Sequence, residues 1–184
     1  MIVNRWLDGF DVRLRPVTMD DLDAMMTWVN RPEVTQNFAR LSRAISREEE
    51  AQWLHRTLES DADRLYAIED RDGAYIGNAG LHQIYWPARA ARLGVVVANQ
   101  QGRGIGQQTI KLLSAAAFLD HGLHKVWLIH YRTNTRMAHI TAKLGFAFEG
   151  VLRDEYFHQD GYHDMIRLSL LDHEFTRLRG SWGL

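Results

Sequence analysis

Three alternating glycines stand where an apolar run gives way to a helical pattern. The segment Gly102–Gly106 follows the run Leu93–Val97 and precedes a periodic apolar stripe. Glycine lets the backbone approach a ligand closely, and converging N–H groups at a helix start favour an anion. The segment therefore predicts a strand, a phosphate-binding turn and a helix, with Arg103 as a cation at the rim. The alternative is a tight turn without a ligand.

The glycine spacing limits which phosphate ligand the turn can hold. A Walker loop requires a glycine and a lysine followed by serine or threonine, and the segment lacks this pattern. A dinucleotide site requires the spacing G-x-G-x-x-G and an acidic residue at the end of the next strand. The next predicted strand ends at His130 and Tyr131 instead. Both kinds of nucleotide site are therefore disfavoured.

Length and composition restrict the function further. The chain has 184 residues, a formal net charge of −1 and no cysteine. This length suits one domain, and the near-neutral charge gives no electrostatic reason to expect nucleic-acid or membrane binding. Without cysteine there are no disulfides, zinc-thiolate sites or cysteine nucleophiles. No apolar run approaches the ~20 residues of a membrane helix, and no signal peptide is visible. We expect a single cytoplasmic domain over residues 1–184.

Apolar periodicity and capping signals predict the order of helices and strands. Ser46 and Glu49 form a capping box, Asn134 can cap a later helix, and Gly122 can end the helix after the glycine turn. Hairpins and crossovers both occur in this order, so we expect a mixed sheet covered by helices, an α+β fold. The expected strands are Val12–Arg15, Leu65–Ile68, Tyr75–Tyr85, Leu93–Val97, Val126–Tyr131, Ala147–Tyr156 and Tyr162–Leu170. The expected helices begin near Thr18, Ser46, Ile105 and Asn134; the first carries Leu22 to Val29, and the third an apolar stripe from Ile105 to Leu119.

Several motifs in the second half of the chain point to one family. Gln101-x-x-Gly104-x-Gly106 is followed by Asn134, by Lys143-Leu144-Gly145-Phe146 and by Phe148-Glu149-Gly150. In this order and at these distances the motifs resemble those of the GNAT superfamily of acyl-CoA N-acyltransferases. The similarity is greatest to the branch with ribosomal-protein N-terminal, spermidine and nucleotide-aminosugar acetyltransferases.

The resemblance implies a GNAT fold with a core over about 11–175. Its central sheet would have about seven strands, two of them splayed, and about four flanking helices. The splayed strand would bind pantetheine, the glycine turn the pyrophosphate, and a backbone N–H near Val95 or Val96 the oxyanion. Acetyl-CoA would be the co-substrate, and no metal is expected. The implied cofactor residues are Val95, Val96, Val97, Gln101, Gly102, Arg103, Gly104, Ile105, Gly106, Gln107, Asn134, Met137 and Lys143.

Two positions depart from the family pattern and leave the proton transfers open. Thr141 stands where many relatives have a tyrosine acid, and Arg92 where many have a glutamate base. Thr141 is a candidate catalytic residue that would hydrogen-bond the sulfur or order a water; the alternative is a buried residue on the helix face. A primary alkylamine with a pKa of about 10 must lose a proton before it attacks, so another acceptor is needed. The resemblance places Glu155 at the substrate end of the cleft and makes it the first candidate base. His82, His130 or a chain of waters are the alternatives.

The acceptor is expected to bind near the loop between the two N-terminal helices. In this loop Glu33 is opposed by several arginines, including Arg40 and Arg43. With Glu33, Arg40 and Arg43 as the candidate substrate-binding residues, that balance argues against a polycation such as spermidine and suits an acceptor that carries an acid or phosphate. The alternative is that the arginines are solvated or pair with Glu48 to Glu50. Acceptors left open are a small amine, a protein N-terminus and a lysine. The alternatives to an acetyltransferase are an enzyme for another acyl group, such as succinyl, a catalytically weak acyl-CoA sensor, and a nucleotide-binding module. The protein could be a monomer, or a homodimer paired through an edge strand near Tyr162–Leu170.

Overall fold

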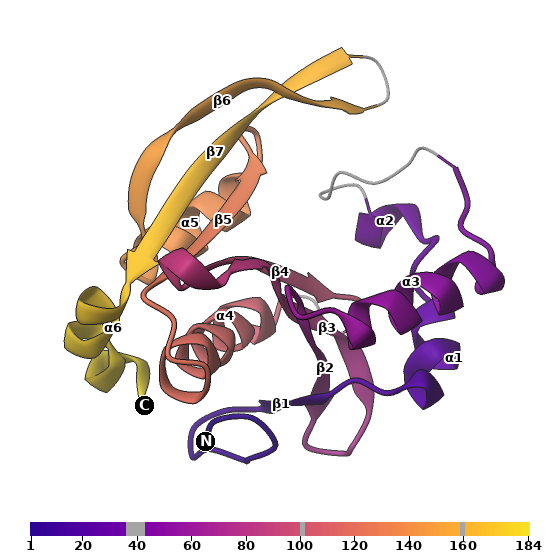
Figure 1. The fold of residues 1–184 in the computed structure, drawn as a ribbon, viewed down its shortest axis with the longest axis horizontal. Coiled ribbons are helices and arrows are strands. Elements are labelled where there is room, and N and C mark those ends of the chain that lie inside the picture. The colour runs from indigo at the N-terminus through magenta and orange to yellow at the C-terminus, as the bar shows by residue number, and fades with distance from the viewer. Residues whose placement is uncertain (36–42, 100–101, 159–160) are drawn as a thin grey trace.

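A computed structural model describes all residues except 36–42, 100–101 and 159–160. Within this part, seven strands form one mixed sheet in the order β1-β2-β3-β4-β5-β7-β6. Figure 1 shows a sheet whose two halves carry different helices. The strands are β1 (Val12–Pro16), β2 (Arg64–Asp70), β3 (Tyr75–Tyr85), β4 (Ala90–Val97), β5 (Lys125–Tyr131), β6 (Ala147–His158) and β7 (Gly161–Leu171). The helices are α1 (Leu22–Met26), α2 (Pro32–Thr35), α3 (Arg47–Glu59), α4 (Ile105–Ala115), α5 (Thr135–Lys143) and α6 (Asp172–Leu178).

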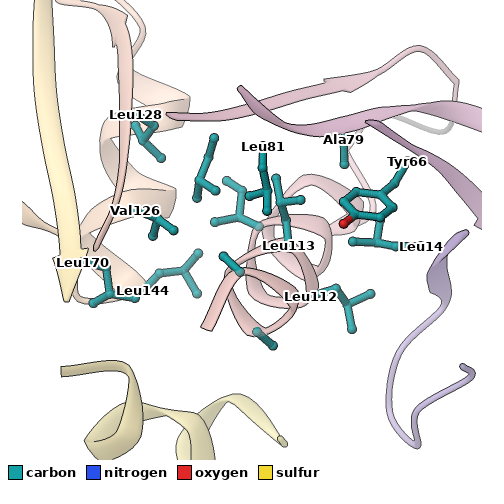
Figure 2. Close-up of a cluster of buried hydrophobic side chains, with 14 of the residues drawn as sticks. Leu14, Tyr66, Ala79, Leu81, Leu112, Leu113, Val126, Leu128, Leu144 and Leu170 are labelled. Carbon is teal, nitrogen blue, oxygen red and sulfur yellow. The ribbon is translucent and has the colours of Figure 1, made fainter. Parts of the chain in front are cut away.

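The first four strands form an antiparallel half-sheet with helices on both faces. Residues alternate between the two faces of a strand, so this half-sheet contributes side chains to two apolar clusters. One cluster joins Leu65 and Ala67 to α1 and α3. The other joins Leu81 and Leu93 to α4. In Figure 2, Leu81 lies beside Leu113 of α4, while Val126, Leu128 and Leu170 lie farther along, on the side of β5 and β7. All of them belong to one cluster, so α4 connects both halves of the sheet.

The second half contains β5, β6 and β7 with α5 and α6. β7 pairs with β5 on one side and with β6 on the other, both antiparallel. The β6–β7 hairpin is long and projects beyond the rest of the sheet (Figure 1). The expected edge position of Tyr162–Leu170 is therefore wrong, because β6 lies outside it and forms that edge of the sheet.

The two halves meet at β4 and β5, which pair over only a short length. In the described residues, the parallel register joins Ala90–Arg92 to Lys125–Trp127, and no pairing follows it. Beyond Arg92 the two strands diverge. This confirms the splayed centre expected from the family resemblance, and it opens the sheet next to the glycine turn.

The capping signals locate most elements correctly. The Ser46 hydroxyl accepts from the Glu49 N–H at 3.2 Å, and the Asn134 side chain accepts from the Met137 N–H at 3.0 Å. Gly122 ends the third predicted helix with a φ of 64°. The α+β fold class is confirmed, although the described residues contain six α-helices rather than about four. The additional two are the four-residue α2 and the C-terminal α6.

Two details of the predicted helices are wrong. The first helix was expected to continue to Val29, but α1 ends at Met26 and a series of turns follows. The apolar stripe of α4 was expected to include Leu119, which is 50% exposed. The chain forms a π-turn over Ala116–Asp120, and its wider turn moves Leu119 off the buried face.

Candidate active site

A cleft of about 780 Å³ runs from the glycine turn through the gap between β4 and β5. Its walls include residues of α3, α4 and α5 and of strands β3 to β7, so it crosses both halves of the sheet. Among the candidates from the sequence, the lining includes these residues: Glu33, Arg43, Val95, Val96, Val97, Gly106, Asn134 and Met137. The fold thus brings together residues that lie about one hundred positions apart.

The glycine turn lies at one end of this cleft. Gly102 and Gly104 have φ angles of 91° and 77°, in the left-handed region that favours glycine. Gly104 is the N-cap of the eleven-residue α4, so the N–H groups of Ile105, Gly106 and Gln107 belong to the first turn of the helix. Such N–H groups have no intrahelical partners and attract anions. Arg103 is exposed beside them, while Gln101 lies outside the described residues.

Backbone alternation on β4 identifies the N–H groups that face the gap. The Ala98 N–H donates to the Ile76 oxygen at 2.9 Å, and the register pairs Asn78 with Val96 and Ala79 with Val95. Hydrogen-bonded and non-hydrogen-bonded pairs alternate in an antiparallel ladder. The backbone N–H and C=O groups of Val96 therefore point toward β3. In agreement, the Val96 oxygen lies 2.0 Å from where a Cβ on Gly77 would stand. The alternation therefore directs the Val95 N–H away from β3, into the gap left by β5.

Helix α5 provides the opposite wall of the gap. Asn134 and Met137 line the cleft from its first turn. Thr141 is fully buried and outside the lining residues, and its hydroxyl donates to the carbonyl oxygens of Met137 and Ala138 at 2.9 and 3.1 Å. Lys143 is exposed in the last turn and is likewise outside the lining.

The candidate base Glu155 is exposed on β6 and does not line the cleft. Its neighbour Tyr156 does. The register of β6 against β7 shifts between Leu152 and Tyr156, and Asp154 has a φ of 52°. A bulge of this kind changes the direction of the side chains around it, which strand alternation alone does not predict. Tyr156 was therefore missed as a cleft residue.

Two histidines line the cleft from different strands. The His82 Nδ1 lies 2.9 Å from the Asp63 carboxylate, and burial lowers the pKa of His82 while Asp63 opposes this effect. His130 is 4% exposed, and its Nδ1 lies 2.8 Å from the Tyr131 carbonyl oxygen. Asp63 was not a candidate from the sequence, because its contact depends on the register of β2 against β3.

The end of the cleft below α3 is lined by charged and aromatic side chains. Arg43 forms a bidentate ion pair with Glu49, with contacts of 2.5 and 2.9 Å, which lowers the pKa of Glu49 to about 2. Trp53 and Arg56 of α3 line the same region and were not candidates from the sequence. Arg40 lies outside the described residues.

Two further properties concern metals and membranes. Within the described part of the chain, no three histidine, aspartate or glutamate side chains come together in the way a metal ion would require. None of the helices described has the length and apolar character needed to cross a bilayer.

Comparison with known proteins identifies the fold and the family. The family model "Acetyltransferase (GNAT) domain" matches residues 11–147. The chain belongs to the GNAT acetyltransferase family. The spermidine N(1)-acetyltransferase of Escherichia coli (strain K12) is 27% identical over 175 residues, which cover 89% of this chain and 88% of that protein. The Vibrio cholerae enzyme of the same name is 28% identical over 119 residues, 64% of this chain and 69% of that protein.

A solved structure agrees with this assignment at the level of the fold. The spermidine N-acetyltransferase of Vibrio cholerae in complex with CoA and spermine superposes with a TM-score of 0.85 at 24% sequence identity. The match covers 90% of this chain and 98% of the other. The GNAT chain described here is thus an N-acetyltransferase that uses acetyl-CoA as its acyl donor. Its residues fit that donor, because a helix N-terminus and an open β4 edge lie along one cleft.

Proposed function

We propose that this GNAT enzyme acetylates the primary amine of a small molecule whose other end is neutral or anionic. The charges around the acceptor end of the cleft support this proposal. Among the described residues, four arginines line the cleft as a whole (Arg43, Arg56, Arg92 and Arg136) against three glutamates (Glu33, Glu49 and Glu50). A polycationic acceptor would need carboxylates that are not already neutralised.

The glutamates of the cleft have arginine partners or are inaccessible. Glu49 pairs with Arg43 at 2.5 Å, and Glu33 lies 3.7 Å from Arg31. Glu50 is only 1% exposed. Arg56, by contrast, is exposed on α3. An acceptor with a carboxylate or phosphate could therefore pair with an arginine, whereas spermidine would have to compete with existing ion pairs.

For the donor, we assign the pyrophosphate to the first turn of α4 and the pantetheine to the gap beside β4. The N–H groups of Ile105, Gly106 and Gln107 would hold the phosphates, with Arg103 as a neighbouring cation. The Val95 N–H is placed to donate to the thioester oxygen as negative charge develops there. The amine would then attack the carbonyl carbon directly, with both substrates bound.

A panel of amines tests the acceptor class. CoA thiol release would be measured with spermidine, with an uncharged primary amine and with primary amines that carry a carboxylate or a phosphate. We expect kcat/KM to be about tenfold or more higher for an anionic amine than for spermidine, since one favourable ion pair is worth about 1.4 kcal/mol or more in a partly buried site. A preference for spermidine would contradict the proposed acceptor class.

A charge reversal in the cleft provides a matched test. Arg56→Glu is expected to lower kcat/KM for the anionic amine and raise it for spermidine. Arg177→Glu, an equivalent change on the surface of α6, serves as the control and is expected to leave the ratio of the two values unchanged. Equal effects of both substitutions would show that the cleft charge does not select the acceptor.

A further inference from the structure

Three side chains form a chain of hydrogen bonds that ends in the cleft. The Ser60 hydroxyl donates to the Asp63 carboxylate at 2.8 Å, and the other carboxylate oxygen lies 2.9 Å from the His82 Nδ1. An ionised carboxylate can only accept, so Nδ1 must carry the proton. In the neutral ring, Nε2 then bears the lone pair. The Asp63 contact thereby fixes both the tautomer and the direction of the His82 ring.

Two glycines provide the space that the imidazole occupies. A Cβ on Gly80 would lie 2.4 Å from the His82 Nε2, and a Cβ on Gly94 would lie 3.1 Å from the same atom. Gly80 and Gly94 face each other across β3 and β4, so the ring lies over the backbone of this pair. Any larger residue at Gly80 would displace it. The ring is therefore held against the strand whose Val95 N–H faces the gap, one residue from Gly94.

His82 lies on the same face of the sheet as Arg92, the position at which many relatives have a glutamate base. Register places His82 opposite Arg92, and both line the cleft. Arginine at this position cannot accept a proton at neutral pH. A histidine in the adjacent strand, on the same face, can replace the base that the family pattern leads one to expect at Arg92.

We propose that His82, oriented by Asp63, accepts the proton that the acceptor ammonium must lose before it attacks the thioester. The inference rests on the proposed acetylation of a small primary amine. One proton of the ammonium passes to Nε2, which becomes imidazolium. The amine nitrogen bonds to the carbonyl carbon, the C–S bond breaks, and the departing thiolate takes a second proton from the nitrogen. The products are the amide and the CoA thiol, and the imidazolium returns its proton to water.

Burial, together with the charge of Arg92, favours the neutral ring at physiological pH by lowering the pKa of His82. Burial lowers the pKa of His82 below its ordinary 6.5, Asp63 raises it, and Arg92 lowers it. In the described part of the chain, the other ionisable side chains that line the cleft come from six places. They are Glu49, Glu50 and Arg56 on α3, His130 on β5, Arg136 on α5, Tyr156 on β6, Glu33 on α2, and Arg43. A neutral imidazole is the form that accepts a proton, so His82 would be active at pH 7 and would lose activity as the pH falls through its lowered pKa.

Two measurements test the assignment separately from the identity of the acceptor. Nitrogen NMR of the free enzyme should show His82 with its proton on Nδ1; a proton on Nε2 would overturn the inference whichever amine is acetylated. For kinetics, His82→Gln should lower kcat/KM by about 10²–10³-fold with an alkylamine of pKa about 10. The loss should be tenfold or less with an amine whose pKa lies well below the assay pH, because that amine is already deprotonated.

The second set of variants separates catalysis from structure. Asp63→Asn should move the acid limb of the kcat/KM profile to lower pH, because the carboxylate raises the pKa of His82. His124 pairs with Asp172 at 3.1 Å outside the cleft lining, so His124→Gln is the matched control and should leave the profile unchanged. Equal losses of His82→Gln with both amine classes would indicate a structural role and overturn the inference. So would a selective loss for the alkylamine in His130→Gln instead of His82→Gln.

Discussion

At the residue scale, Asn134 shows how one side chain can serve both the fold and the cleft. Its side-chain amide oxygen caps α5 by accepting from the Met137 N–H at 3.0 Å, and the residue also lines the cleft. The sequence predicts both roles. An asparagine before a helical pattern predicts a cap, and the family resemblance predicts a contact between Asn134 and the acyl donor. Thr141, by contrast, is buried with its hydroxyl bonded inside its own helix, which agrees with a place on the buried face of that helix.

Substitutions at Asn134 should separate the two roles. Asn134→Ala removes the cap and should lower the free energy of unfolding by about 1 kcal/mol. Asn134→Asp keeps a capping oxygen and should retain most of this stability, while its negative charge should weaken acetyl-CoA binding. Denaturant unfolding and a titration with acetyl-CoA would measure the two effects. Unchanged acetyl-CoA affinity in Asn134→Asp would argue against a contact with the donor.

At the element scale, local signals set where elements begin, but pairing sets which residues face one another. The Ser46 capping box fixes the start of α3 from four residues of sequence. The contact of Asp63 with His82 follows instead from the register of β2 and β3, which pairs Arg64 with Leu81. That register contains a shift between Ile68 and Glu69. Counting residues outward from the turn without this shift would place Asp63 opposite Leu81 instead of His82.

The capping box of α3 gives a stability prediction. Ser46→Ala removes the bond to the Glu49 N–H and should destabilise the protein by about 1 kcal/mol. Because α3 carries Trp53 and Arg56 into the cleft, the KM for the acceptor should rise more than the KM for acetyl-CoA. Thr176→Ala is the control, since that hydroxyl bonds a carbonyl oxygen within a helix and caps no terminus. A similar loss of stability in both variants would contradict the capping argument.

At the scale of the whole molecule, the sheet is nearly divided at its centre. β4 and β5 are joined over Ala90–Arg92 and diverge beyond it (Figure 1). The cleft continues along the gap between them. α4 packs against both halves and holds them together. Acetyl-CoA bound in the gap would contact both halves of the sheet. Because the unfolded chain cannot make these contacts, binding should stabilise the folded protein.

Thermal unfolding measures how much a bound donor stabilises the folded protein. Acetyl-CoA at about one hundred times its Kd should stabilise the folded protein by about 2.7 kcal/mol and raise the Tm. Val97→Glu, which puts a negative charge beside Gly106 at the phosphate end, should abolish most of the shift. Leu58→Glu introduces the same charge at an exposed apolar position on α3 and serves as the control, so it should leave the shift in Tm unchanged. A shift of equal size with ATP would indicate that the glycine turn binds phosphates without selecting CoA.

The sequence by itself determined the α+β class, the order of the principal elements, the family and the position of the glycine turn. These depend on local patterns: apolar periodicity, caps and glycines, each readable within a few residues. Tertiary structure alone decided the path of the cleft, the inward position of Tyr156 rather than Glu155, and the Asp63 contact that orients His82. These depend on strand register, bulges and the divergence of β4 from β5, which are set by packing between residues far apart in the chain.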